Sequence, residues 1–150
     1  MNHQSPITNH QSLILAIDTC FGTFSVTLNM GEKEIAHFES QEHTKQAEQL
    51  IPRIEEILNT AKLSYKDLDY IAVNVGPGSF TGLRIGLAAV KGIILAVPKI
   101  TPIAVTSLEA AAFAKNGGEV FLNAGRGQAF TQKFDEQNTE ICPPQLVEYE

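Results

Sequence analysis

The segment NVGPGSFTGLRIGLAAVKG, residues 74–92, constrains the fold of this chain more than any other. An apolar run precedes it, three glycines fall within seven residues, and a long apolar segment follows. A loop of this shape between a strand and a helix often holds phosphate, because its backbone amides point outward. The first question is whether these glycines bind a nucleotide or allow something to pack closely.

Neither of the two common phosphate-binding motifs matches this loop. The P-loop requires G-x-x-x-x-G-K-[ST], but Gly76 to Gly82 is one residue too long and Leu83 replaces the lysine. The dinucleotide motif G-x-G-x-x-G fits at Gly76 and Gly78 but has Thr81 at its sixth position. A weak anion site at the start of the helix remains an open alternative.

Small residues continue into the predicted helix at 80–96. Gly82, Gly86 and Ala89 follow at four- and three-residue steps, and Gly92 lies close to the same side. Each glycine inside a helix costs about 1 kcal/mol relative to alanine, so a close contact should offset the loss. The helix is apolar nearly all round, which predicts burial on more than one side. The stripe should therefore pack within the chain or receive a helix of another protein.

Composition limits the possible functions. With 150 residues, 43% of them hydrophobic, the chain fits one domain of ordinary size with a real core. Its formal net charge of −6 argues against nucleic-acid binding by the chain alone, because phosphate binding needs a basic surface. Cys20 and Cys142 have no zinc-site spacing and are predicted to be free thiols in a reducing cytoplasm. The longest apolar stretch is too short to span a bilayer, so we expect a cytoplasmic protein without membrane contact.

The hydrophobic pattern predicts a mixed α/β sheet covered by helices. Strands are expected at residues 13–17, 23–30, 33–39, 70–75 and 102–106. The first three can pair as an antiparallel meander, while the last two must join through helical crossovers and hence in parallel. The first strand is apolar throughout and should be buried on both faces. In the helix expected at 44–61, Pro52 should introduce a kink or mark a late start.

The two ends of the chain give weaker signals. Residues 1–12 carry the tetrapeptide NHQS twice and are predicted to be a disordered extension. Thr106 and Glu109 form a capping box for a further helix that stops at residues 116–118. The segments EVFLN and GQAFTQKF then predict a hairpin around AGRG, and the last eight residues give no clear pattern.

Six segments, in order, resemble the TsaB (YeaZ) family of bacterial proteins, which are needed to make threonylcarbamoyladenosine on tRNA. They are LAIDT, EHT before LIPRI, VGPGSFTGLRIGLAAVKGI, PIAVTSLEAAA and FLNAGRGQAF, and they extend from about residue 13 to 134. The resemblance implies an actin-like, sugar-kinase-type (ASKHA) fold with a first lobe at 13–106 and a truncated, rudimentary second lobe at 107–150. Asn123 departs from the aspartate that the family tends to have.

The resemblance also implies a non-catalytic scaffold without cofactor or metal. Its partner would be a TsaD-like catalytic subunit, a TsaE-like ATPase would join the complex, and tRNA would be reached only through the complex. The partner would contact the two helices of the first lobe. The predicted interface residues are Leu50, Ile54, Ile57, Gly82, Gly86, Ala89 and Ile93. A homodimer through the same helices remains an alternative.

An enzymatic alternative rests on Asp18, which ends the first strand. It could serve a small ATP-binding phosphotransferase together with the Gly76–Gly82 loop, or it could simply cap backbone amides. TsaD-like proteins bind metal through H-x-x-x-H, but here His43 is followed at that spacing by Ala47. Ser79 does not fit the G-x-S-x-G nucleophile motif and is predicted to be a helix N-cap.

Overall fold

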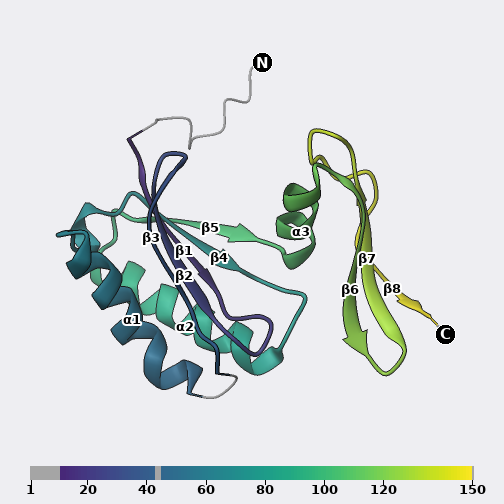
Figure 1. Ribbon diagram of the computed structural model, residues 1–150, viewed down its shortest axis with the longest axis horizontal. Helices are drawn as coiled ribbons and strands as arrows, with labels where there is room; N and C mark the ends of the chain where they lie inside the picture. The colour runs from purple at the N-terminus through teal and green to yellow at the C-terminus, as the bar shows by residue number, and fades with distance from the viewer. Residues whose placement is uncertain (1–10, 43–44, 150) are drawn as a thin grey trace.

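The computed structural model describes residues 11–42 and 45–149, which form two sheets and three α-helices (Figure 1). The elements are β1 (Leu13–Asp18), β2 (Ser25–Met30), β3 (Lys33–Glu39), α1 (Gln46–Thr60), a 3₁₀ turn η1 (Tyr65–Asp67), β4 (Tyr70–Asn74), α2 (Phe80–Ala96), β5 (Thr101–Val105), α3 (Ser107–Lys115), β6 (Gly118–Gly125), β7 (Gln128–Phe134) and β8 (Gln145–Glu148).

The larger sheet has the strand order β3-β2-β1-β4-β5. The pairs β3–β2 and β2–β1 are antiparallel, while β1–β4 and β4–β5 are parallel. The predicted mixed five-stranded sheet is therefore confirmed. Helical crossovers force the parallel pairs, since α1 connects β3 to β4 and α2 connects β4 to β5.

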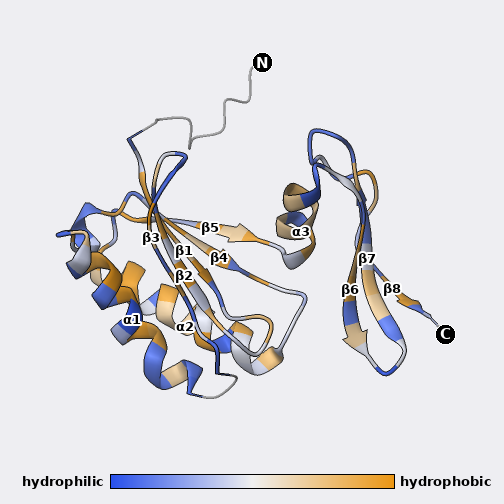
Figure 2. Ribbon diagram, viewed as in Figure 1, coloured by the Kyte–Doolittle hydropathy of each residue, from blue (hydrophilic) through white to orange (hydrophobic). Residues whose placement is uncertain are grey.

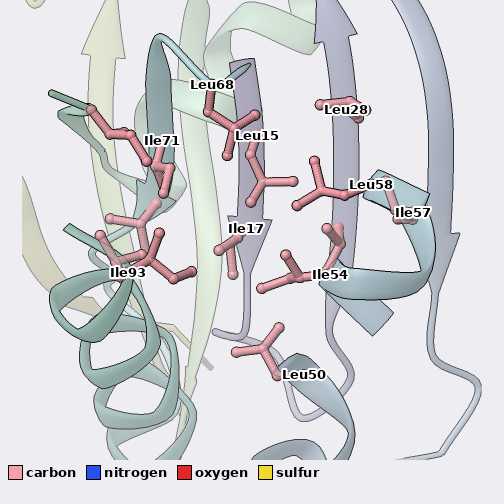
Figure 3. Packing of buried hydrophobic residues seen from close by; sticks show 14 of the residues in the cluster. Leu15, Ile17, Leu28, Leu50, Ile54, Ile57, Leu58, Leu68, Ile71 and Ile93 are labelled. Carbon is pink, nitrogen blue, oxygen red and sulfur yellow. The ribbon is translucent and has the colours of Figure 1, made fainter. Parts of the chain in front are cut away.

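The main core lies between this sheet and the helices α1 and α2. Figure 3 shows Leu15 and Ile17 of β1 pointing toward Leu50 and Ile54 of α1, with Ile93 of α2 beside them. Apolar residues three and four apart give α1 one buried stripe, and its other side is hydrophilic (Figure 2). The helix α2 is mainly hydrophobic (Figure 2), but its buried residues form one stripe, so within the described chain it is not buried on more than one side as the sequence predicts.

One expectation about β1 is wrong. Its residues alternate between buried and half-buried, with Leu13, Leu15 and Ile17 in the core and Ile14 and Ala16 on the opposite face. Both α1 and α2 contact the same face of the sheet, so the strand is fully buried on that face only. The apolar run thus reflects a central position in the sheet rather than helices on both sides.

A second, smaller core lies beyond residue 106. The helix α3 packs on the hairpin β6–β7 through Leu108, Ala112, Val120 and Phe134. The predicted capping box holds, because Thr106 N donates to Glu109 Oε2 and Glu109 N donates to Thr106 Oγ1. The tail, where no clear pattern predicts an element, adds β8 to the edge of β7.

The helix α1 begins at Gln46 and contains Pro52, so the proline does not mark a late start. The predicted extension at 1–12 lies outside the described residues except for Gln11 and Ser12. Ser12 is buried, and its carbonyl accepts a hydrogen bond from Gly31 N, so it belongs to the folded part. No helix of the described residues is both long and apolar enough to cross a membrane.

Candidate functional site

The carboxyl ends of β1 and β4 meet in a network of polar side chains. Asp18 Oδ1 accepts from Cys20 N at 2.8 Å, and Asp18 Oδ2 accepts from Asn74 Nδ2 at 2.9 Å. Asn74 Oδ1 in turn accepts from Gly76 N and from Ser107 Oγ, each at 2.9 Å. Asp18 thus caps an amide, as one of its two predicted roles required, and both carboxylate oxygens are engaged.

The glycine loop that follows β4 packs directly onto Cys20. Ser79 N donates to the Cys20 carbonyl at 2.7 Å, and a Cβ added at Gly78 would lie 2.6 Å from the same oxygen. Ser79 Oγ accepts from Gly82 N at 3.2 Å, which confirms the predicted N-cap. The amides of Gly76, Ser79 and Gly82 are therefore bonded within the chain. This use of the amides argues against the loop as a phosphate cradle.

The first two glycines of α2 face Thr19, the residue after β1. Thr19 Oγ1 donates to the Gly82 carbonyl at 2.7 Å, and a Cβ at Gly82 would overlap the Thr19 carbonyl oxygen. A Cβ at Gly86 would lie 2.6 Å from Thr19 Oγ1. Of the two possibilities left open by the sequence, packing within the chain therefore holds for Gly82 and Gly86.

The predicted interface residues are mostly buried within the described chain. Six of the seven are buried in the described chain: Leu50, Ile54, Ile57, Gly82, Gly86 and Ile93. They form the inner faces of α1 and α2, because the stripe that is most apolar is the one that packs on the sheet. Ala89 alone remains partly accessible.

An open apolar groove lies between α1 and α2. One hollow of about 530 Å³ is lined by Ala47, Leu50, Ile51, Thr81, Arg84, Ile85, Ala88 and Ala89. A second hollow of about 400 Å³ is lined by Ile51, Glu55, Tyr65, Ala88, Ala89, Gly92, Ile93, Ala96 and Val97. The two share Ile51, Ala88 and Ala89, so they are parts of one trough, which we call the α1–α2 groove.

Large apolar side chains are exposed on these helices. Ile51 of α1 is 36% exposed, and Phe80 and Leu95 of α2 are 73% and 82% exposed. Burying such side chains against another protein would be favourable, since about 25 cal/mol is gained for each Å² of apolar surface removed from water. The α1–α2 groove is therefore a candidate interaction surface.

A third hollow lies between the glycine loop and the β6–β7 hairpin. Its volume is about 370 Å³, and its lining includes Cys20, Ser79 and Asn123 but no charged side chain. Burial and the nearby Asp18 carboxylate raise the pKa of the Cys20 thiol to about 11, so the thiol stays protonated at neutral pH. No group of three or more metal-ligating side chains gathers in the part of the chain that the structure describes. His43, which the sequence predicts to be a helix-end or surface residue rather than a metal ligand, lies outside that part.

The sequence alone did not single out Thr19, Asn74 or Ser107 as contact residues. Each is an ordinary polar residue at the end of a strand or start of a helix, and its partner is between 33 and 63 residues away. The one usable signal was the cluster of glycines itself. It indicated a close approach without indicating the neighbour.

Comparison with known proteins gives one consistent family. The model of the family "TsaD: tRNA N6-adenosine threonylcarbamoyltransferase" matches residues 38–147, more than half of the chain. The curated "tRNA threonylcarbamoyladenosine biosynthesis protein TsaB" of Escherichia coli is 37% identical over 89% of this chain, and that of Buchnera aphidicola from Schizaphis graminum is 31% identical over 91%. The matches cover 64% and 67% of those two proteins, so the chain spans about two thirds of their length.

Solved structures agree on the fold. A Pseudomonas aeruginosa protein described as similar to peptidase YEAZ superposes with a TM-score of 0.76 at 23% identity, over 91% of this chain and 67% of that one. A second structure, YeaZ from the same organism, gives 0.75. Together with the sequence matches, these findings show that the chain belongs to the TsaD-type family and, within it, to the TsaB (YeaZ) proteins.

Proposed function

We propose that the chain is a non-catalytic scaffold that binds a TsaD-like catalytic subunit and so supports threonylcarbamoyladenosine formation on tRNA. The relatives' names state a role in that biosynthesis. The observation that carries the proposal is the α1–α2 groove, an apolar trough between two helices that is lined by the exposed Ile51, while Phe80 and Leu95 are exposed elsewhere on α2. A groove of this kind fits a helix of another protein.

The interface residues in this proposal differ from those first predicted. The helices are the same, but the contact surface is the outer side of each. It comprises Ala47, Ile51, Thr81, Arg84, Ala88, Ala89, Gly92 and Ala96. Of the original set, Leu50, Ala89 and Ile93 line the groove, and only Ala89 of these three is more than slightly accessible.

The non-catalytic part of the proposal is supported by how Asp18 is held. A phosphotransferase would need this carboxylate free to bind a metal–phosphate group, whereas its two oxygens accept hydrogen bonds from Cys20 N and Asn74 Nδ2. In the glycine loop, the amides of Gly76 and Ser79 likewise donate hydrogen bonds within the chain. These bonds make Asp18 a positioning residue for the loops at the end of the sheet.

The proposal also covers the other members of the assembly. With a formal net charge of −6, the chain should reach tRNA only through its partners. A TsaE-like ATPase would join the same complex in the cytoplasm. A homodimer through the groove is the arrangement we expect when the catalytic subunit is absent.

Two measurements on the purified chain test the proposal. It should co-purify with the TsaD-like protein of the same organism, and it should not hydrolyse ATP at a rate above that of its Asp18→Ala variant. Failure to bind that protein would refute the scaffold role. ATP turnover that disappears in the Asp18→Ala variant would instead favour the phosphotransferase.

A further inference from the structure

The two edges of the larger sheet are built differently. At one edge, β3 carries the exposed charges of Lys33, Glu34 and Glu39. The pairing of β3 with β2 also shifts register between Leu28 and Asn29. Charges and bulges of this kind keep an edge strand from pairing with other chains. At the other edge, β5 has the sequence TPIAV, which holds no charged residue, and it pairs with β4 without a register shift (Figure 1). The edge at β5 therefore lacks both protections.

The alternation of backbone groups along β5 determines what this edge offers to a partner. The Val105 carbonyl accepts a hydrogen bond from Val75 N, so Val105 turns its backbone groups toward β4. Because neighbouring residues of a strand direct these groups to opposite sides, Pro102 and Ala104 turn theirs to the open edge. No strand in the described part of the chain lies on that side of β5. Since proline has no N–H, the open edge offers the carbonyls of Pro102 and Ala104 and the N–H of Ala104.

A hollow of about 430 Å³ lies beside the end of β5. It is lined by two residues of β5, three of α3 and one of the loop after β7, namely Ala104, Val105, Glu109, Ala110, Phe113 and Asn138. The Phe113 side chain is 74% exposed, so an occupant of the hollow would bury apolar surface against its ring. The hollow shares no lining residue with the α1–α2 groove and is a separate surface.

The polar side chains of this hollow favour a positively charged occupant. Glu109 uses its Oε2 in the capping box of α3 and brings a carboxylate charge to the lining. Asn138 Oδ1 is buried and has no hydrogen-bond partner among the described residues. No lysine or arginine lines the hollow. A carboxylate, an unpaired amide oxygen and the face of the Phe113 ring together suit a cation that carries N–H donors, such as a guanidinium or ammonium group.

We propose that the open edge of β5 binds an extended, basic segment of another protein, which adds a strand to the sheet and places an arginine or lysine side chain in the hollow. The backbone of the segment pairs with Pro102 and Ala104, and its basic side chain lies against Phe113 and Glu109. The positive charge of the segment complements the formal net charge of −6 on the chain. Because this surface is separate from the α1–α2 groove, the inference does not depend on the proposed function.

A synthetic peptide, acetyl-Val-Thr-Arg-Thr-Val-amide, is the probe, because its β-branched residues favour an extended backbone. Nuclear magnetic resonance of the isotope-labelled chain follows the titration. At millimolar peptide the amide signals of Ala104 and Phe113 should shift, and hydrogen exchange at the Ala104 N–H should slow. The same peptide with N-methylated backbone amides, or with glutamate in place of arginine, should bind about tenfold more weakly or less. Equal binding of either altered peptide would overturn the proposal.

Two substitutions in the chain test the edge and the hollow separately. Ala104→Pro removes the N–H from the open edge but no bond to β4, and it repeats the residue already present at Pro102. It should weaken binding of the arginine peptide by about tenfold. Glu109→Gln removes the charge but keeps the capping box, because glutamine also caps at this position. It should weaken binding by about threefold at low salt, and by less at high salt.

Each substitution has a matched control. Pro102→Ala adds an N–H donor to the same edge and should strengthen binding of the arginine peptide. Glu32→Gln, in the exposed turn between β2 and β3, removes a carboxylate far along the sheet from β5 and should leave binding unchanged. Circular dichroism of each variant shows that a loss of binding is not a loss of folding.

The outcomes separate the possible occupants of the edge. If the arginine peptide leaves the Ala104 signal unchanged, or if Ala104→Pro binds the peptide like the wild type, no strand is added at β5 and the proposal is wrong. If the wild-type chain sediments as a dimer that Ala104→Pro dissociates, the occupant is a second copy of this chain, and the proposed basic segment is overturned. None of these results changes binding of the TsaD-like subunit at the α1–α2 groove, so the scaffold role is tested independently.

Discussion

On one side of α2, Gly82 and Gly86 face Thr19, whereas on the other side Gly92 faces the open α1–α2 groove. A Cβ at Gly82 would overlap a backbone oxygen, but a Cβ at Gly92 would have no atom within 4 Å. The same residue type in one helix therefore meets two different requirements. Gly82 and Gly86 allow the helix to contact the end of β1, and Gly92 belongs to a surface that no described element covers.

The comparison shows why spacing alone could not separate the two sides. Residues 82, 86, 89 and 92 follow at steps of three and four, which is the spacing of a single helical face. Small drifts in angle accumulate over ten residues, so that Gly82 points into the chain while Gly92 lies in the groove wall. Which side of α2 packs within the chain depends on where Thr19 lies. The spacing of residues in the helix does not predict that position.

The largest effect should come from Gly82→Ala. The added methyl group would overlap the Thr19 carbonyl oxygen, which is backbone and cannot rotate away, and would disturb the bond from Thr19 Oγ1 to the Gly82 carbonyl. Overpacking costs 1–3 kcal/mol in typical cores and occasionally more, so we expect a loss of about 3 kcal/mol. Urea denaturation of the isolated chain measures this loss. If the Gly82→Ala variant were as stable as the wild type, the backbone at the end of β1 could move away from the added methyl group at little cost, and the contact would not be tightly packed.

The next effect should appear in binding rather than folding. Ala88 is exposed and lines both hollows of the α1–α2 groove, so Ala88→Trp should fill the groove and block a docked helix. We expect affinity for the TsaD-like subunit to fall at least tenfold, about 1.4 kcal/mol, with the free energy of unfolding within about 0.5 kcal/mol of wild type.

The matched control for this substitution is Ala114→Trp, at an exposed position on α3. It adds the same side chain away from the groove and should leave binding unchanged. Isothermal titration of both variants against one partner preparation gives the comparison. Equal affinities for the two variants would rule out the groove as the docking surface.

Much of the fold could be predicted from local signals. The antiparallel meander of the first three strands and the parallel pairing of the later ones follow from where apolar runs alternate with helical segments, and the helix 80–96 was predicted with the bounds that the structure gives. Side-chain capping at Ser79 and at Thr106 was also predicted, because each cap involves residues three positions apart. Such features depend only on residues that are close together in the sequence, so one sequence is enough to predict them.

The candidate site could be predicted only in part. The two helices were named correctly as the covering layer of the sheet, but most of the interface residues were chosen from stripes with three- and four-residue spacing, and Leu50, Ile54 and Ile93 of these stripes are buried in the core. A helix buries that side against its own sheet first. The remaining outer side holds smaller residues such as Ala88, and these give only a weak hydrophobic signal. The cis peptide between Gly76 and Pro77 was not anticipated either.

A smaller effect of opposite sign should come from Gly92→Ala, the same substitution ten residues further along α2. Nothing lies within 4 Å of the added Cβ, and alanine is favoured over glycine in a helix by about 1 kcal/mol. We expect the free energy of unfolding of the isolated chain to rise by about that amount, measured in the same urea titrations as Gly82→Ala. A loss of stability would indicate that this side of α2 is also packed, and the difference drawn between Gly82 and Gly92 would be wrong.

The smallest effect concerns Cys20, which the glycine loop covers on the same side as Thr19. Burial first, and the Asp18 charge second, raise the pKa of its thiol from 9.0 to about 11 in the folded chain. The folded state therefore holds this proton more tightly than the unfolded state, and the resulting stability is present below pH 9 and is lost as the pH rises toward 11. Between pH 7 and pH 9.5 the loss attributable to Cys20 should be about 0.8 kcal/mol. Chemical denaturation of the wild type and of Cys20→Ala at both pH values isolates this amount, because the raised pKa of Tyr65 acts equally in the two proteins and cancels in the difference. If both proteins lose the same stability over this interval, the glycine loop does not keep water from Cys20, and the packed side of α2 is more open than its hydrogen bonds indicate.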